Sequence, residues 1–213
     1  MVLKLYGYVH STAAKLVAMV LYEKEIPFEY IEIDLSTKKN RSEAYLAIQP
    51  FGQVPCIDDD GFILYESRAI ARYLEEKHPN QGTKLIPSDP KKRALFDQAA
   101  SIEAFNFDCY GVPLFYEVFV NPRYGKEVNH EKAKELTATL GTKLDIYEQI
   151  LAKQPYLSGD ELTLADLYHL PVGNVLFMAG INVISERPNV ARWYNNMASR
   201  PSWQKVKDGL GAA

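Results

Sequence analysis

The sequence predicts an α/β unit followed by an all-helical unit, and three observations lead to this prediction. Residues 1–78 alternate between strand-like and helix-like hydrophobic patterns, whereas residues 91–213 show helical patterns only. Between them, residues 79–90 contain prolines and a glycine without any periodic pattern, which is typical of a linker. The length of 213 residues corresponds to roughly 1.4 domains of about 150 residues, which fits two small units.

The first unit is expected in the order strand, helix, strand, short helix, two strands and helix. The first helix starts at Thr12, because apolar residues then recur at the spacing of one helical face, and Pro27 ends it. Three aspartates and a glycine at residues 58–61 predict a hairpin turn. A helix that starts at Ser67 and ends near Pro79 closes the unit. The strands are expected at residues 2–6, 29–33, 54–57 and 62–65.

The second unit is expected to consist of helices only. Thr163 and Asp166 have the spacing of a capping box, with Asp in place of the usual Glu or Gln. This pair is therefore interpreted as serving folding and not catalysis. Losing such a cap would lower the stability of the fold by about 1 kcal/mol. The helices are expected at residues 91–120, 129–152, 163–179, 188–198 and 202–207.

Composition excludes several classes of protein. The chain has 24 basic and 27 acidic residues and a net charge of −3, without the basic excess of nucleic-acid binders. Its two cysteines, Cys56 and Cys109, match neither a disulfide scaffold nor a zinc site. We therefore expect no bound metal, and we expect the protein to reside in a reducing compartment. The first residues lack the apolar run of a signal peptide, and no segment is apolar for long enough to span a membrane. We therefore expect a cytoplasmic protein with no nucleic-acid or membrane partner.

Ser11 stands where the loop after the first strand meets the first helix. One interpretation is a helix N-cap, a role for which Thr12 competes. The other is a hydroxyl donor close to the positive end of the helix, where it would stabilise a thiolate. The neighbouring His10 is interpreted as a surface loop residue. No Gly-x-Ser-x-Gly pattern surrounds Ser11, which argues against a serine hydrolase.

Two further segments have both a structural and a functional interpretation. Ser67 is either a helix N-cap or part of a helix N-terminus that binds a carboxylate, with Glu66 pairing an ammonium. Together Glu66 and Ser67 would hold the head group of an amino acid. Pro55, in Gln53–Val54–Pro55, is either an ordinary trans edge proline or a cis proline that turns the backbone of Val54 toward an extended ligand.

The stretch from residue 104 to residue 120 is rich in aromatic side chains. They are too many and too evenly spread to be buried on a single helix face, so part of the stretch is expected to line an apolar pocket. The aromatic residues are Phe105, Phe107, Tyr110, Phe115, Tyr116 and Phe119.

Taken together, these segments resemble the cytosolic glutathione transferases over the whole chain. The most specific stretches are residues 49–55, 64–70 and 200–203. Within the family the chain looks most like the phi class. The signals are Ser11–Thr12 at the first helix, Phe-Gly-Gln-Val-Pro at 51–55, and the stretch from Glu103 through Glu117 to Pro122 in the helical part. The resemblance implies a thioredoxin-like first domain, an all-helical second domain, a homodimer, and glutathione as co-substrate with no bound cofactor.

The resemblance also implies a role for each site residue. Ser11 would donate a hydrogen bond to the glutathione sulfur, and Val54, with Pro55 cis, would pair its backbone with the cysteinyl part. Glu66 and Ser67 would hold the γ-glutamyl ammonium and carboxylate, and Gln53 would help to orient the same moiety.

At the glycyl end of glutathione the chain departs from the phi pattern. That pattern has His-Lys where this chain has Asn40–Arg41. Arg41 keeps a positive charge and can grip a carboxylate with two hydrogen bonds, whereas Asn40 cannot replace a cation. Tyr8 is a rival to Ser11 as the thiol donor, since other classes carry a catalytic tyrosine near this place. The continuation typical of those classes is missing here.

The chemistry requires one well-placed donor. A free thiol has a pKa near 8.5, and lowering it by roughly two units takes about 2.7 kcal/mol. One hydrogen bond to a charged group supplies about 1.5–3 kcal/mol. A hydroxyl at a helix N-terminus therefore suffices without a metal or a protein cysteine.

Three functions compete on these grounds. The first is a glutathione transferase whose thiolate attacks apolar electrophilic small molecules. The second is glutathione-dependent peroxide reduction, and the third is a ligand-carrying or scaffold protein of the same fold. The residues proposed for the electrophile pocket are Leu35, Tyr110, Phe115, Tyr116 and Phe119.

Overall fold

The computed structural model describes residues 2–210, which form two compact units. The first unit runs to Leu85 and also includes the chain from Arg200 to Leu210, and the second runs from Ile86 to Ser199. The sequence pattern placed residues 200–210 with the helical part instead. They group with the first unit because they pack on its first helix, as described below.

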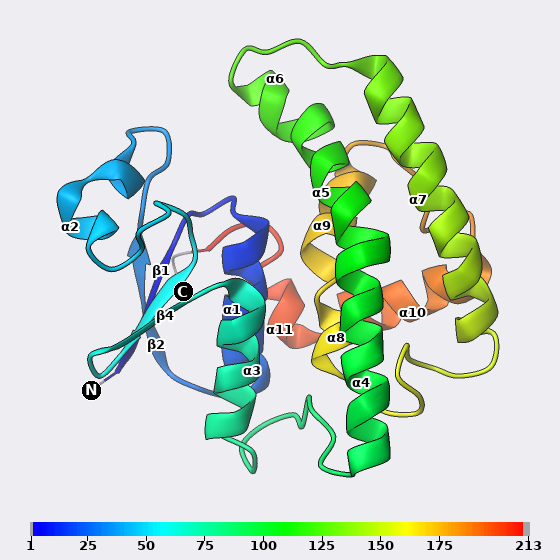
Figure 1. Ribbon diagram of the computed structural model, residues 1–213, viewed down its shortest axis with the longest axis horizontal. Helices are drawn as coiled ribbons and strands as arrows, with labels where there is room; N and C mark the ends of the chain where they lie inside the picture. The colour runs from blue at the N-terminus through cyan, green and yellow to red at the C-terminus, as the bar shows by residue number, and fades with distance from the viewer. Residues whose placement is uncertain (1, 211–213) are drawn as a thin grey trace. The chain divides into compact units, whose positions relative to one another are not determined.

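The first unit is built on a mixed four-stranded sheet in the order β2-β1-β3-β4. β1 pairs in parallel with β2, and the β1–β3 and β3–β4 pairs are antiparallel. In Figure 1, α1 and α3 lie together beside the sheet and α2 lies on its other side. The elements are β1 (Leu3–Gly7), α1 (Thr12–Glu23), β2 (Phe28–Glu32), η1 (Lys39–Arg41), α2 (Glu43–Leu46), β3 (Cys56–Asp59), β4 (Phe62–Tyr65), α3 (Ser67–Lys77) and α11 (Pro201–Gln204).

Apolar side chains from the sheet and both helices form the core of the first unit. The expected order of strands and helices is confirmed, and the hairpin turn has positive φ at both Asp60 and Gly61, as a two-residue hairpin of this kind requires. The third strand begins at Cys56 and not at Val54, because the peptide before Pro55 departs from strand geometry. Fully buried core residues include Leu5, Val17, Ile57, Ile70 and Leu74.

The second unit is helical throughout its regular part. The expected long helix at 91–120 is present as a nearly continuous rod that changes to π-helical winding twice, at η2 and η3. The expected helix at 163–179 is interrupted after Leu167. The elements are α4 (Pro90–Glu103), η2 (Ala104–Asp108), α5 (Cys109–Phe115), η3 (Tyr116–Val120), α6 (Asn121–Arg123), α7 (His130–Leu151), α8 (Leu164–Leu167), α9 (Leu170–Met178) and α10 (Pro188–Ala198).

The capping box predicted at Thr163 is the centre of a larger buried network. Asp166 accepts hydrogen bonds from the backbone N–H and the hydroxyl of Thr163, at 2.9 and 2.8 Å. Its other oxygen accepts from the N–H of Leu157 at 2.9 Å and the indole N–H of Trp193 at 3.0 Å. The pair therefore serves folding, as predicted, and ties α8 to α10. Within residues 2–210, no helix has the length and apolarity needed to cross a membrane.

Candidate active site

Ser11 is the N-cap of α1. Its Oγ accepts a hydrogen bond from the N–H of Ala14 at 3.2 Å, and Thr12, the rival for this role, is the first helical residue. Because the hydroxyl acts as acceptor in the cap, its own proton can be donated to a ligand. The half-buried Ser11 side chain thus lies at the positive end of a 12-residue helix.

Tyr8 belongs to the same turn as Ser11. The backbone N–H of Ser11 donates to the carbonyl of Tyr8 at 2.8 Å, and the Tyr8 ring meets that of His10 edge-on at 5.6 Å between centroids. His10 is exposed, as expected for a loop residue. The geometry therefore keeps both candidate hydroxyl donors within one short turn.

The Val54–Pro55 peptide bond is cis, the arrangement that the resemblance implies and that an isolated X-Pro bond seldom has. The segment before it is fixed on both sides. The Tyr45 hydroxyl donates to the carbonyl of Gln53 at 2.7 Å, and the Gln53 N–H donates to Oε1 of Gln49 at 3.1 Å. Val54 is thus held in an irregular peptide directly before β3, with its backbone outside the regular ladder.

The structure corrects the interpretation of Ser67. The N-cap position of α3 belongs to Glu66, which has φ 72° and ψ 109°, and Ser67 is the first helical residue. Ser67 is therefore not the N-cap that its position after a strand suggests, because the chain turns into the helix at Glu66. The exposed Glu66 side chain and the Ser67 hydroxyl adjoin the first turn of α3, whose N–H groups point toward the helix N-terminus.

Asn40 and Arg41 brace the loop that leads to Val54. The Asn40 amide donates to the carbonyl of Gly52 at 2.7 Å, and Nη1 of Arg41 donates to the carbonyl of Phe51 at 3.1 Å. Gly52 has φ +61°, and a Cβ there would lie 2.8 Å from Nη1 of Arg41. The glycine is therefore needed for this close approach. Arg41 keeps further N–H donors on its exposed guanidinium for a carboxylate.

The five candidates for the electrophile pocket differ in environment. Leu35 belongs to the first unit and is half-buried. In the second unit, Phe115 is buried and stacks on half-buried Phe119 at 5.6 Å, whereas Tyr116 is 52% exposed. Tyr110 is half-buried, with Nζ of Lys143 5.9 Å from its ring centroid. The π-helical turns change the helical phase along 104–120, so regular 3.6-residue spacing does not predict these exposures.

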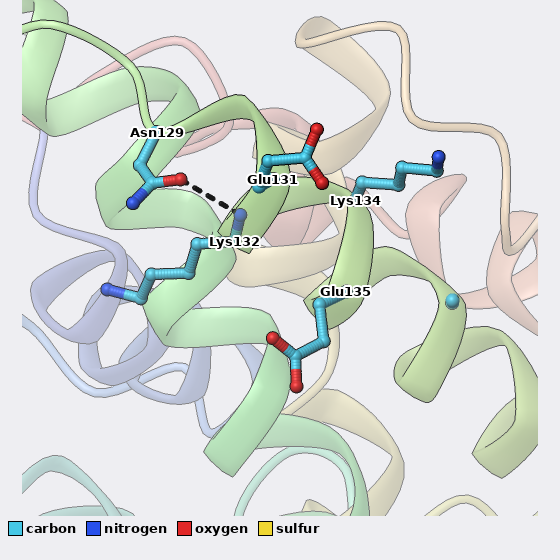
Figure 2. Close-up of a pocket in the computed structure, with 6 residues that line it drawn as sticks. Asn129, Glu131, Lys132, Lys134 and Glu135 are labelled. Carbon is cyan, nitrogen blue, oxygen red and sulfur yellow. Dashed lines mark hydrogen bonds between the residues drawn. The ribbon is translucent and has the colours of Figure 1, made fainter.

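One surface hollow of about 650 Å³ lies beside the start of α7, and none of the predicted site residues lines it. Figure 2 shows its acidic and basic side chains diverging, with the amide of Asn129 capping the helix through the N–H of Lys132 at 3.0 Å. The hollow is an open, mixed-charge surface. Among the described residues, no group of His, Cys, Asp and Glu side chains is arranged to hold a metal.

Two side chains that the sequence pattern did not single out lie behind the Tyr8–Ser11 turn. Oε1 of Glu32 accepts a hydrogen bond from the N–H of Val9 at 3.3 Å, and Oε2 accepts from the Tyr30 hydroxyl. The strand pattern at 29–33 predicts that Tyr30 and Glu32 share a face, but not that this face meets the turn.

Comparison with known proteins shows similarity to glutathione S-transferases in both units of the chain. Residues 5–82 match the family model of the glutathione S-transferase N-terminal domain, and residues 111–201 match that of the C-terminal domain. Glutathione S-transferase F12 of Arabidopsis thaliana is 40% identical over 208 residues, 97% of each chain.

Solved structures are similar over the same extent. Glutathione transferase F7 from Populus trichocarpa has a TM-score of 0.93 at 36% identity, covering 96% of this chain and 97% of that one. Glutathione S-transferase I from maize, solved with an atrazine–glutathione conjugate, has a TM-score of 0.89 at 32% identity and covers 97% of both chains. This chain is therefore a member of the glutathione S-transferase family of enzymes, most like its phi class.

Proposed function

We propose that this chain conjugates glutathione to apolar electrophiles and that Ser11 holds the glutathione thiol as a thiolate. The observation that carries the proposal is the cap geometry. The Ser11 hydroxyl accepts from the N–H of Ala14, which leaves its proton to donate at the positive end of α1. A donor and a helix N-terminus at one point both favour the anion over the neutral thiol.

The remaining groups of glutathione find chemically matched residues in the same unit. Glu66 is proposed to pair the γ-glutamyl ammonium, while Ser67 and the first turn of α3 receive the carboxylate. The backbone of Val54, set by cis Pro55, is proposed to pair with the cysteinyl part, and Gln53 to orient the γ-glutamyl part.

For the glycyl carboxylate we propose Arg41 as the ligand and Asn40 as its support. The Asn40 amide is engaged with the carbonyl of Gly52, so its contribution is to hold the loop. Arg41 uses one donor on the carbonyl of Phe51 and has others available.

The electrophile is proposed to be apolar. The maize relative's structure contains a conjugate of glutathione with atrazine, and the candidate contacts here are Leu35, Tyr110, Phe115, Tyr116 and Phe119. We also propose that the protein works as a homodimer in the cytoplasm, as the family resemblance implies.

The test is turnover of a chlorodinitrobenzene-type electrophile with glutathione. We expect Ser11→Ala to lower kcat/KM at pH 7 roughly 10- to 100-fold, the loss of one hydrogen bond to a charged group, with glutathione binding measured by calorimetry retained. Thr12→Val removes the neighbouring hydroxyl and is expected to leave turnover unchanged.

Two outcomes would contradict this assignment. Full activity of Ser11→Ala together with lost activity of Tyr8→Phe would make Tyr8 the donor. Glutathione binding by the unmodified protein without turnover at any pH would make it a carrier.

A further inference from the structure

The turn that carries Ser11 is held from behind by a carboxylate on the neighbouring strand. We propose that Glu32 is a positioning residue for Ser11, which fixes the Val9 peptide and so the direction in which the Ser11 hydroxyl points. The inference rests on the proposed role of Ser11 as thiol donor.

The placement of Glu32 follows from the register of the sheet. β1 and β2 run parallel, with Gly7 beside Glu32 and Leu5 beside Tyr30. Since residues two apart share a face, the Tyr30 and Glu32 side chains project together. One Glu32 oxygen accepts from the Val9 N–H at 3.3 Å, and the other accepts from the Tyr30 hydroxyl.

Gly7 makes room for this pair. A Cβ at Gly7 would lie 3.1 Å from Cε2 of Tyr30 and 3.1 Å from Cβ of Ala14, closer than side chains normally pack. The Tyr30 ring and the first turn of α1 therefore both approach the backbone at the end of β1. This places the carboxylate of Glu32 beneath the turn that joins β1 to α1.

The backbone of Val9 is held on the other side of its Cα as well. Its carbonyl accepts from the N–H of Leu210 at 3.3 Å. Two residues further on, the N–H of Ser11 donates to the carbonyl of Tyr8 at 2.8 Å. Only His10 separates the clamped residue from Ser11, so a shift of the Val9 peptide would be passed directly to the Ser11 hydroxyl.

The hydrogen bonds of Glu32, and not its charge, are the useful feature here. A negative charge near a thiolate would raise the thiol pKa, which opposes catalysis. Burial, the hydrogen bond to Glu32 and the nearby charges raise the pKa of Tyr30, so its hydroxyl stays protonated as a donor. Glutamine retains an oxygen that accepts from the Val9 N–H and removes the charge. Its NH2 group can donate to the oxygen of the Tyr30 hydroxyl in place of accepting from it.

The experiment compares Glu32→Ala, Glu32→Gln and Glu29→Ala by the pH profile of kcat at saturating glutathione and by the ultraviolet absorbance of the bound thiolate. Glu29 is the matched control, an exposed glutamate on the same strand. For Glu32→Ala we expect the pKa of the bound thiol to rise by about one unit, from roughly 6.5 to roughly 7.5, which lowers the thiolate fraction and kcat at pH 7 about threefold, while KM for glutathione stays within about twofold. Glu32→Gln keeps an acceptor and loses a charge that raises the thiol pKa, so it should show no such rise. Glu29→Ala should keep the parent profile.

Other titratable groups surround the turn, so the profile needs a suitable background. Tyr8 and His10 lie on the turn itself, Tyr30 and Glu32 on β2, and Lys15 on α1. Each variant is therefore also measured with His10→Gln, which keeps the titration of the imidazole out of the profile.

Three results would overturn the proposal. Lower thermal stability of Glu32→Ala with an unmoved profile would make its role structural, and an equal rise of the thiol pKa in Glu32→Ala and Glu32→Gln would show that the acceptor kept by glutamine does not position Ser11. A shift caused equally by Glu29→Ala would make the effect non-specific.

Where Glu32→Ala does not fold, Tyr30→Phe keeps the ring beside Gly7 and removes only the hydroxyl that holds Glu32. We expect a smaller shift in the same direction, and an unmoved profile would contradict the proposal. Ser11→Ala measured in parallel separates the two levels of inference. An unaffected Ser11→Ala defeats the proposed function, whereas an unaffected Glu32→Ala beside an impaired Ser11→Ala defeats only the role of Glu32.

Discussion

The backbone of Glu66 lies in a region that residues with a side chain seldom adopt. Its φ of 72° and ψ of 109° belong neither to a helix nor to a strand. Such conformations cost on the order of 1–3 kcal/mol and are concentrated at functional sites. Glycine would relieve the strain, so a glutamate at this position indicates a use for its carboxylate.

Glu66→Gly should separate stability from binding. We expect unfolding by urea to show unchanged or slightly higher stability, by at most about 1 kcal/mol, because strain is relieved and glycine is an acceptable N-cap. KM for glutathione should rise, because the ammonium loses its partner. Glu25→Gly is the matched control, since Glu25 also has a positive φ, 53°, and lies beyond the C-terminal end of α1. An equal rise in KM for both variants would contradict the role of Glu66.

The two thiols should differ in reactivity. Burial, with a smaller contribution from the charge of Asp58, raises the pKa of Cys56 to about 12, whereas Cys109 is exposed. We expect iodoacetamide at neutral pH to label Cys109 only, and both cysteines in denaturant, because the thiolate is the reactive form. Mass spectrometry of the protein and of Cys109→Ser checks this. Labelling of Cys56 in the folded protein would contradict it.

At the scale of an element, the segment after α3 is fitted closely to the end of α1. The Thr83 N–H donates to the carbonyl of Glu23 at 2.8 Å, and buried Lys24 donates to the carbonyl of Thr83 at 3.0 Å. Lys24 also pairs with buried Glu75 on α3 at 2.6 Å. Gly82, with φ +59°, stands where this contact is tightest. A Cβ there would lie 2.2 Å from the Glu23 carbonyl oxygen.

Gly82→Ala and Gly125→Ala form a matched pair. Both glycines have positive φ, but a Cβ at Gly125 would meet nothing within 4 Å. We expect Gly125→Ala to cost about 1–2 kcal/mol, the strain of the left-handed conformation alone. Gly82→Ala should cost more than about 3 kcal/mol, because backbone atoms must also separate. Chemical denaturation measures the free energy of unfolding of both variants. Equal losses of stability would show that the segment around Gly82 moves aside without cost and would contradict the prediction.

The elements also show how far sequence alone reaches. Local patterns predicted the strand and helix order, the hairpin turn and the Thr163–Asp166 box, because periodicity, turn residues and caps act over a few residues. Leu157 and Trp193, which also donate hydrogen bonds to Asp166, lie elsewhere in the chain, and no local pattern predicts these contacts. Long-range packing, which the sequence pattern does not contain, decides such contacts.

The same limit applies to the candidate site. Ser11 was placed correctly at a helix start, since a serine after a turn and before an apolar face marks an N-cap. The role of Glu66 in turning the chain into α3 was assigned to Ser67, because serine is the better N-cap by propensity. Glu32 was not singled out, because its partner Val9 contributes only a backbone N–H. Almost every residue has a backbone N–H, so the identity of Val9 does not indicate that its N–H binds a carboxylate.

At the scale of the whole molecule, Arg200 anchors the later part of the chain to α1. Its guanidinium makes two hydrogen bonds to the carboxylate of Glu23, at 2.6 and 2.7 Å, and Ser202 donates to the same carboxylate. Burial disfavours the charged form of Glu23, but hydrogen bonds from Arg200, Ser202 and Thr83 outweigh it. The pKa of Glu23 is therefore lowered.

This ion pair should make stability sensitive to acid. A carboxyl with a lowered pKa in the folded state stabilises it above the unfolded pKa, about 4.3, and loses that contribution as pH falls through the folded pKa. We expect Glu23→Gln to show a shallower fall in the free energy of unfolding than the parent between about pH 5 and 3. Glu25→Gln, at an exposed neighbour, should behave like the parent. Parallel slopes for the Glu23 variant would contradict the prediction.

The return of residues 200–210 to the first unit has a consequence for biogenesis. A ribosome adds roughly 5–20 residues per second and releases the start of the chain first. The sheet and α1 therefore emerge seconds before Arg200 and Leu210, which complete the contacts of Glu23 and Val9. The first unit therefore cannot complete its internal contacts until residues 200–210, which follow the whole second unit, have been made. The part of the protein that is made first is the part that is finished last.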